Sequence, residues 1–264
     1  MKKLLTLLLS LVLIVGACLG LTACGNGSDL KRVEKNGKLV VGVTVYEPMD
    51  YLDENGEWTG FDAELAKEFA KSLDVNCQIV IITWSQKITE LNSKQIDLVW
   101  NGMTASDELG EKIDFSVSYA KNAQVAVVKN NSSITTKEQI KNAKIAVENK
   151  SAGHTAATEV IGATNITPLT AQIDALTDVL SGNSEVAIID LTMAQSVIGK
   201  GEYANLKVVE GVSYGDEIFA VGLRKDSDLK EKLDSFLKGK YKDGSLAQLA
   251  EKYNVVLNTE ALSK

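Results

Sequence analysis

The sequence predicts an α/β fold, from two observations. From residue 38 onward, β-rich runs alternate with stretches of helical periodicity. Most of the runs are rich in Val and Ile without strict alternation, which is typical of strands buried on both faces. The runs cover residues 38–43, 77–83, 96–100, 124–128, 144–147, 185–189, 206–209 and 218–223. Strand–helix alternation of this kind implies mostly parallel sheets covered by helices on both faces.

The N-terminal segment predicts export. Lys2 and Lys3 precede an almost wholly apolar stretch, residues 4–15, which is the pattern of a signal peptide. The stretch is shorter than the roughly 20 apolar residues that a membrane span needs. Small residues before Cys24 resemble the bacterial lipoprotein signal, which implies removal of residues 1–23 and a lipid anchor on Cys24. Cys18 is a weaker alternative because Gly16 fits that signal less well, and ordinary secretion is the other alternative.

The amino-acid composition argues against several kinds of partner, metal site and catalytic site. The formal net charge is −7 and there are no basic runs, which argues against nucleic acid as a partner because Lys and Arg dominate phosphate binding. A single histidine argues against a histidine-based metal site or catalytic triad. Cys77 is the only cysteine after Cys24, so no internal disulfide or cysteine metal cluster is expected. We expect no cofactor and no metal.

The helices are predicted between the strands. Apolar residues recur every four positions from Phe61 to Leu73, which predicts a helix with one apolar face. Asp62 is its expected N-cap. Thr136 and Gln139 have the spacing of a capping box. Apolar spacing also predicts helices over residues 173–180 and 229–237.

The ends of the strands provide candidate binding residues. In such sheets, ligands bind beyond the carboxyl ends of the strands, and N-terminal amides of helices point at anions. The residues that follow predicted strands are Tyr46, Trp84, Gly102, Thr104, Ser151 and Asp190. Aromatic faces, one carboxylate and a helix start suit a small zwitterion.

Four further stretches have recognisable patterns: residues 46–56 (YEPMDYLDENG), 59–66 (TGFDAELA), 97–104 (DLVWNGMT) continuing to 113–116 (IDFS), and a closing helix pair over residues 233–253. They resemble one known family, the extracellular solute-binding proteins of family 3, which serve polar amino-acid ABC transporters. Their order and spacing together are specific, and the resemblance covers the chain from about residue 38 to residue 253.

The resemblance implies a periplasmic-binding-protein-like fold, in which two α/β lobes are joined by two strands and clamp a ligand in the cleft between them. By analogy, the strands cross near residues 119–123 and 215–219. The expected organisation is a signal peptide (1–23), a tether (24–37), lobe 1 (38–120), lobe 2 (121–216) and a return to lobe 1 (217–264). The implied function is capture of a small polar amino-acid-like ligand by a monomer. The ligand then passes to an ABC permease at the extracytoplasmic face of the cell membrane.

The resemblance also implies roles for the candidate residues. Tyr46 and Trp84 match the two aromatics that sandwich the ligand side chain, and Gly102 and Thr104 match positions that receive its amino and carboxylate groups. Ser151 matches the residue that binds the α-carboxylate, and Asp190 the acid that pairs with the α-ammonium. On the residues alone, Ser151 and Asp190 fit helix N-caps equally well.

One position departs from the family. Residues 104–109 read TASDEL, with Leu109 where the family has an arginine that pairs with the ligand carboxylate. Two explanations stay open: another donor substitutes, with Lys150, Lys112 and His154 nearest in sequence, or the ligand is an amine without that carboxylate. We favour an amino-acid-like ligand.

Two other functions remain as alternatives to transport. The first is a ligand-sensing lipoprotein that reports to a signalling partner. The second is a dehydratase on the same fold, for which Glu148 or Glu47 would be the proton donor. The single acid, hydroxyls and aromatics of the predicted site suit recognition better than catalysis, so we expect no enzyme activity and no catalytic residues.

Overall fold

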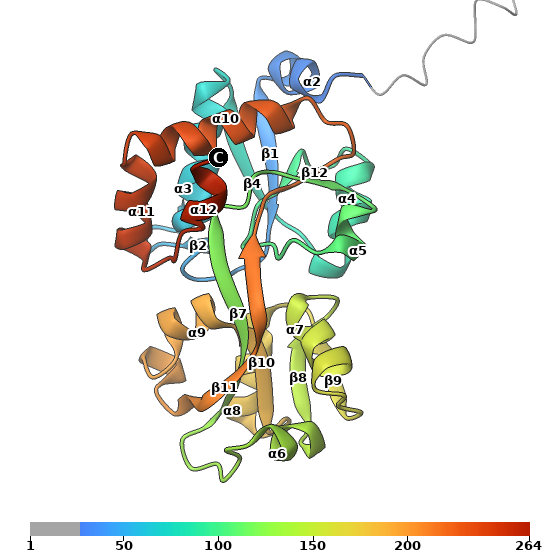
Figure 1. Ribbon diagram of the computed structural model, residues 1–264, viewed down its shortest axis with the longest axis vertical. Helices are drawn as coiled ribbons and strands as arrows, with labels where there is room; N and C mark the ends of the chain where they lie inside the picture. Colours follow the sequence, from blue (N-terminus) through green and yellow to red (C-terminus); the bar gives the residue numbers. More distant parts are fainter. Residues whose placement is uncertain (1–26) are drawn as a thin grey trace, which may run out of the picture.

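The computed structural model describes residues 27–264, so the predicted signal peptide and Cys24 lie outside the described residues. Two lobes follow one another along the long axis of the molecule, and the strands β7 (Ala120–Lys129) and β11 (Leu206–Phe219) run between them (Figure 1). Within residues 27–264 no helix combines the length and the apolar character that a membrane span requires.

The first lobe is built on a five-stranded sheet in the order β4-β1-β5-β12-β6. Its strands are β1 (Lys38–Val43), β4 (Asn76–Ile81), β5 (Leu98–Val99), β6 (Asp114–Phe115) and β12 (Gly222–Leu223), with a separate hairpin of β2 (Tyr51–Leu52) and β3 (Trp58–Thr59). Its helices are α2 (Asp29–Asn36), α3 (Phe61–Ser72), α4 (Lys87–Asn92), α5 (Asp107–Gly110), α10 (Leu229–Lys242), α11 (Ser245–Tyr253) and α12 (Thr259–Leu262), with a 3₁₀ turn η1 (Trp84–Gln86).

The second lobe is built on a sheet in the order β11-β7-β10-β8-β9. Its strands are β7 (Ala120–Lys129), β8 (Ile145–Glu148), β9 (Ile166–Leu169), β10 (Val186–Asp190) and β11 (Leu206–Phe219). Its helices are α6 (Lys137–Asn142), α7 (Ala152–Thr155), the π-helix η2 (Ala156–Val160), α8 (Gln172–Ser181), α9 (Leu191–Val197) and the 3₁₀ turn η3 (Gly201–Tyr203).

Both sheets are mixed, so the prediction of mostly parallel sheets was wrong. Each sheet has two parallel and two antiparallel neighbouring pairs. The parallel pairs come from strands linked through helices. The antiparallel pairs are β7–β10, β7–β11, β5–β12 and β6–β12. Each of them includes either β7, which leaves the first lobe, or β12, which lies in the return to it.

The two connecting strands pair with each other from one lobe into the other. Phe219 of β11 lies opposite Ala120 of β7, and Leu206 lies opposite Lys129 at the far end. The sequence suggested two separate runs, residues 206–209 and 218–223, because the exposed residues between them interrupt the apolar pattern. The strand is nevertheless continuous, with irregular register between Val208 and Ser213 and between Tyr214 and Asp216.

Helix α3 shows how one prediction succeeded while its detail failed. Phe61, Leu65 and Phe69 are buried on one face, as their spacing predicts. Asp62 is not the N-cap, however, because the helix begins one residue earlier, after Gly60. Gly60 has φ of 118°, and a Cβ there would lie 2.2 Å from the Met49 carbonyl oxygen. This turn directs the Asp62 side chain into the core instead of toward the helix end.

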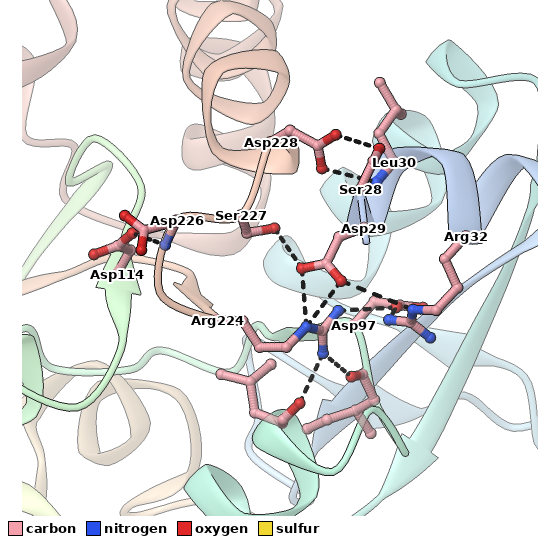
Figure 2. Close-up of polar contacts among 12 residues, drawn as sticks. Ser28, Asp29, Leu30, Arg32, Asp97, Asp114, Arg224, Asp226, Ser227 and Asp228 are labelled. Atoms are coloured by element: carbon pink, nitrogen blue, oxygen red, sulfur yellow. Dashed lines mark hydrogen bonds and ion pairs between the residues drawn. The ribbon is translucent and has the colours of Figure 1, made fainter. Parts of the chain in front are cut away.

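Helix α2 is fastened to the first lobe by buried charges (Figure 2). Arg224 Nε lies 3.0 and 2.9 Å from the two carboxylate oxygens of Asp29, and its Nη2 lies 3.3 Å from Asp97. Arg224 Nη1 donates to the carbonyls of Leu91 and Ile96, each at 2.7 Å. The guanidinium therefore has partners in α2, around α4 and before β5, which fixes the N-terminal helix to the sheet.

Candidate functional site

A cavity of about 750 Å³ lies between the two lobes and brings together most of the predicted site residues. Its wall includes Trp84, Gly102 and Thr104 from the first lobe, and Ser151 and Asp190 from the second. These residues are far apart in sequence and meet because they follow strands whose ends face the gap between the lobes.

Tyr46 is the one predicted site residue that does not line this cavity. Its side chain is 2% exposed and packs edge-to-face on Phe219, with ring centroids 6.4 Å apart. It lies directly behind Gly102, where a Cβ would be 2.7 Å from the Tyr46 ring. Burial and the nearby Asp190 carboxylate raise the pKa of Tyr46 well above its usual value. In this structure Tyr46 supports the cavity wall from behind.

Asp190 is the most unusual group in the wall. It stands at the N-cap position of α9, but its carboxylate does not cap the helix. Instead it accepts hydrogen bonds from Asn122 Nδ2 at 2.5 Å and Gln124 Nε2 at 2.6 Å, and from Gln172 Nε2. All three donors are neutral amides. Burial, followed by repulsion from Glu217, raises the pKa of Asp190 to about 7.

Trp84 shares its side of the cavity with a lysine that sequence reasoning missed. Lys87, at the start of α4, places its Nζ 4.4 Å from the centre of the Trp84 ring. The same Nζ donates to the Trp84 carbonyl at 3.3 Å and, across the cleft, to the Lys150 carbonyl at 3.1 Å. Lys87 is therefore a buried cation that contacts both lobes.

The other predicted residues already make hydrogen bonds within the chain. The Gly102 amide donates to Asp62 Oδ2 at 2.6 Å, and the Thr104 hydroxyl donates to Glu217 Oε2 at 3.0 Å. Ser151 Oγ accepts from the His154 amide at 3.1 Å and so caps α7. These groups are therefore held in place by partners within the chain.

The cavity wall is acidic overall. Its carboxyl groups are Glu108, Glu148, Glu159, Asp190 and Glu217, against the three lysines 87, 112 and 150. Glu148 is 2% exposed, and its Oε1 has no hydrogen-bond partner. Burial, then repulsion from Asp190, raises the pKa of Glu148 well above its usual value. With Glu148 uncharged, four carboxyl groups remain against three lysines, and this small excess favours solutes that carry positive charge.

Two of the three amide donors around Asp190 could have been found from the sequence. Asn122 and Gln124 alternate with small residues on β7, so both side chains point to the same face of the sheet. Polar side chains on one face of a buried strand need partners, and Asp190 of the neighbouring β10 is that partner. The contact of Gln172 with Asp190 could not be found in this way, because only the packing of α8 brings Gln172 to the sheet.

The protein so described is a two-lobed α/β binding protein with a polar, acidic cavity between its lobes. The chain belongs to the bacterial extracellular solute-binding proteins, family 3, which it matches over residues 39–256.

The relatives agree with that class. The arginine-binding extracellular protein ArtP of Bacillus subtilis is 30% identical over 248 residues, which is 92% of this chain and 96% of the relative. A crystal structure of the ArgBP protein from T. maritima, a P235GK mutant, has a TM-score of 0.80 and 30% identity, over 85% of this chain and 98% of that one.

A histidine-bound substrate-binding protein of an ABC uptake transporter from Streptococcus pneumoniae has a TM-score of 0.78 and 28% identity, over 86% of this chain and 96% of that one. The predicted family resemblance and two-lobed fold are thereby confirmed. These relatives are binding proteins, in agreement with the prediction that the chain is not an enzyme.

Proposed function

We propose that this protein binds an amino acid or a related amine in the cavity between its lobes and delivers it to the permease of an ABC importer. One observation carries the proposal: the Asp190 carboxylate is 4% exposed, lines the cavity and has only neutral amide donors as partners. A buried carboxylate without a cation is costly, and the ammonium group of a ligand would supply the missing charge.

The surroundings of Asp190 support a small ligand of this type. The wall combines the face of Trp84, several hydroxyls and an excess of carboxyl groups. The relatives named for arginine and histidine bind solutes with a positively charged or titratable side chain. We assign ligand contacts to Trp84, Gly102, Thr104, Ser151 and Asp190, with Tyr46 as the aromatic behind them.

The proposal includes the arrangement of the chain at the membrane. Residues 1–23 are the signal peptide, Cys24 carries the lipid, and residues 24–37 are the tether, of which Asp29–Asn36 form helix α2 and pack on the first lobe. Lobe 1 comprises residues 38–120 and 217–264, and lobe 2 comprises residues 121–216. The protein then acts as a monomer, anchored on the extracytoplasmic face of the cell membrane beside its permease.

A thermal-shift screen over amino acids, amines and short peptides tests the proposal. At one hundred times its dissociation constant, a ligand stabilises the folded state by about 2.7 kcal/mol, which is readily measured. Asp190→Ala and the isosteric Asp190→Asn should both remove the shift. Asp216→Ala is the matched control for the Asp190 variants, because it also removes an aspartate. Asp216 lies exposed on strand β11 and does not line the cavity. No hit at millimolar concentrations, or an unchanged shift in both Asp190 variants, would contradict the proposal.

A further inference from the structure

Lys87 is a buried cation without an anionic partner. Lys87 is 4% exposed. The ion pairs within residues 27–264 do not include Lys87, so no carboxylate of the described chain lies within 4.0 Å of its Nζ. Its two hydrogen bonds go to backbone carbonyls, Trp84 and Lys150. An ammonium has three N–H donors, so one donor has no partner among the described residues.

Burying an ammonium group without an anionic partner costs folding free energy unless dipoles or a ligand compensate the charge. The Trp84 ring and two carbonyl dipoles compensate in part. Lys87 nevertheless lines the same cavity as Asp190. The cavity thus presents one under-compensated cation and one under-compensated anion, which is the complement of a zwitterion.

The other candidates for a carboxylate-binding cation are less suitable. Lys112 has a side chain that is 48% exposed and is paired with Glu108 at 2.6 Å. Lys150 is exposed, and His154 already accepts a hydrogen bond from the Lys150 amide through its Nδ1 at 3.1 Å. Leu109, which stands where the family has an arginine, lines the cavity and offers no charge.

We propose that Lys87 receives the ligand's carboxylate, in place of the arginine that Leu109 replaces, and that the ligand is therefore an α-amino acid rather than a simple amine. The inference rests on the proposed function of the cavity and specifies its substrate class. The ammonium of the ligand contacts Asp190 of the second lobe, and its carboxylate contacts Lys87 of the first. Because Lys87 also donates to the Lys150 carbonyl across the cleft, bound ligand and lobe closure share one side chain.

The electrostatic surroundings agree with this assignment. Burial lowers the pKa of Lys87 to about 8, while Glu148 and Glu108 favour its charged form and Lys150 and Lys112 oppose it. A bound carboxylate stabilises the ammonium form and raises this pKa again. Affinity for an amino acid should therefore fall as the pH rises above about 8, because the empty cavity then loses the proton that the carboxylate requires.

The test is calorimetric titration with matched pairs that differ only in the carboxylate: arginine with agmatine, and histidine with histamine. For the wild-type protein we expect the amino acid to bind ten- to a hundredfold more tightly than its amine, the range of one charge-assisted hydrogen bond. Lys87→Gln should reduce this preference to less than about threefold. Lys87→Arg should keep the preference and move the decline in affinity to the higher pH at which the ligand's own ammonium loses its proton, since arginine stays charged.

Two further variants distinguish this role from a structural one. Lys112→Gln is the control, because it removes a cation from the same wall and should leave the preference intact. Lys87→Gln combined with Leu109→Arg should restore it. A Lys87→Gln protein that still folds and still prefers the amino acid overturns the assignment. If wild type binds both members of a pair equally, the assignment fails while the proposed function stands. If it binds no member of either pair, the amino acid with the largest thermal shift and its decarboxylated amine replace them, and if no amino acid or amine gives a shift, both fail.

Discussion

At the scale of single residues, the site depends on charges that are buried without a counter-charge. Asp190 is held by three side-chain amides, and Asp62 by the Gly102 amide and the Tyr119 hydroxyl, at 2.6 and 2.8 Å. Burial raises the pKa of each carboxyl group to about 7. Because these folded-state values lie above the unfolded value, each group costs stability as the pH rises from about 4 through 7. This cost is expected where a site is kept ready for a cation.

The affinity for the ligand should accordingly fall as the solution becomes acidic. Only the ionised form of Asp190 attracts an ammonium, so affinity should fall about tenfold for each pH unit below about 7. Titrations of one amino acid between pH 5 and pH 7.5, with the lobes shown to remain folded by circular dichroism, would measure this slope. The Asp190→Asn protein should bind weakly with no such slope. A wild-type affinity that is constant from pH 5 to pH 7.5 would mean that Asp190 does not bind the ammonium.

At the scale of elements, Arg224 helps to fix the N-terminal helix α2 to the first lobe. The guanidinium joins Asp29 of α2 to Asp97 and to two carbonyls near β5 (Figure 2). Its side chain and both carboxylates are less than 10% exposed. Arg32 also pairs with Asp97 and lies 3.8 Å from Asp29. Removing Arg224 would still leave Asp29 with only this longer pair and would take a donor from the carbonyls of Leu91 and Ile96.

Arg224→Met should therefore destabilise the protein by about 3–5 kcal/mol. The neighbouring Lys225→Met is the control, since Lys225 pairs with Asp114 at the surface with 45% of its side chain exposed, and should cost less than about 1 kcal/mol. Urea unfolding of the three proteins gives both numbers. Equal losses in the two variants would show that the Arg224 cluster contributes no more than a surface pair.

The elements also show what the sequence could predict. Helices with regular apolar spacing and the Thr136 capping box were predicted correctly, because both depend on residues close in sequence. Strand β9 was missed, since it is a short edge strand that contains Pro168, a residue that edge strands tolerate. Strand β4 was expected to be buried on both faces, yet it is an edge strand with Ile81 65% exposed. Edge and centre cannot be distinguished by composition when both are rich in Val and Ile.

At the scale of the whole molecule, the cavity exists because β7 and β11 hold two sheets in line so that their strand ends face each other (Figure 1). Side-chain hydrogen bonds between residues on opposite sides of the cleft include those from Lys87 to the Lys150 carbonyl and from Ser196 to Glu47 at 3.0 Å. The strand-end rule and the family resemblance predicted five residues that line the cavity. Lys87 could not be predicted, because its role depends on its burial and on a contact with the opposite lobe.

The most direct test is a crystal structure of the protein with the amino acid that gives the largest thermal shift. We expect the ligand between the lobes, with its ammonium nitrogen about 2.7–2.9 Å from an Asp190 oxygen, as in other charge-assisted hydrogen bonds. Ligand density outside the cavity, or an ammonium group that points away from Asp190, would contradict it.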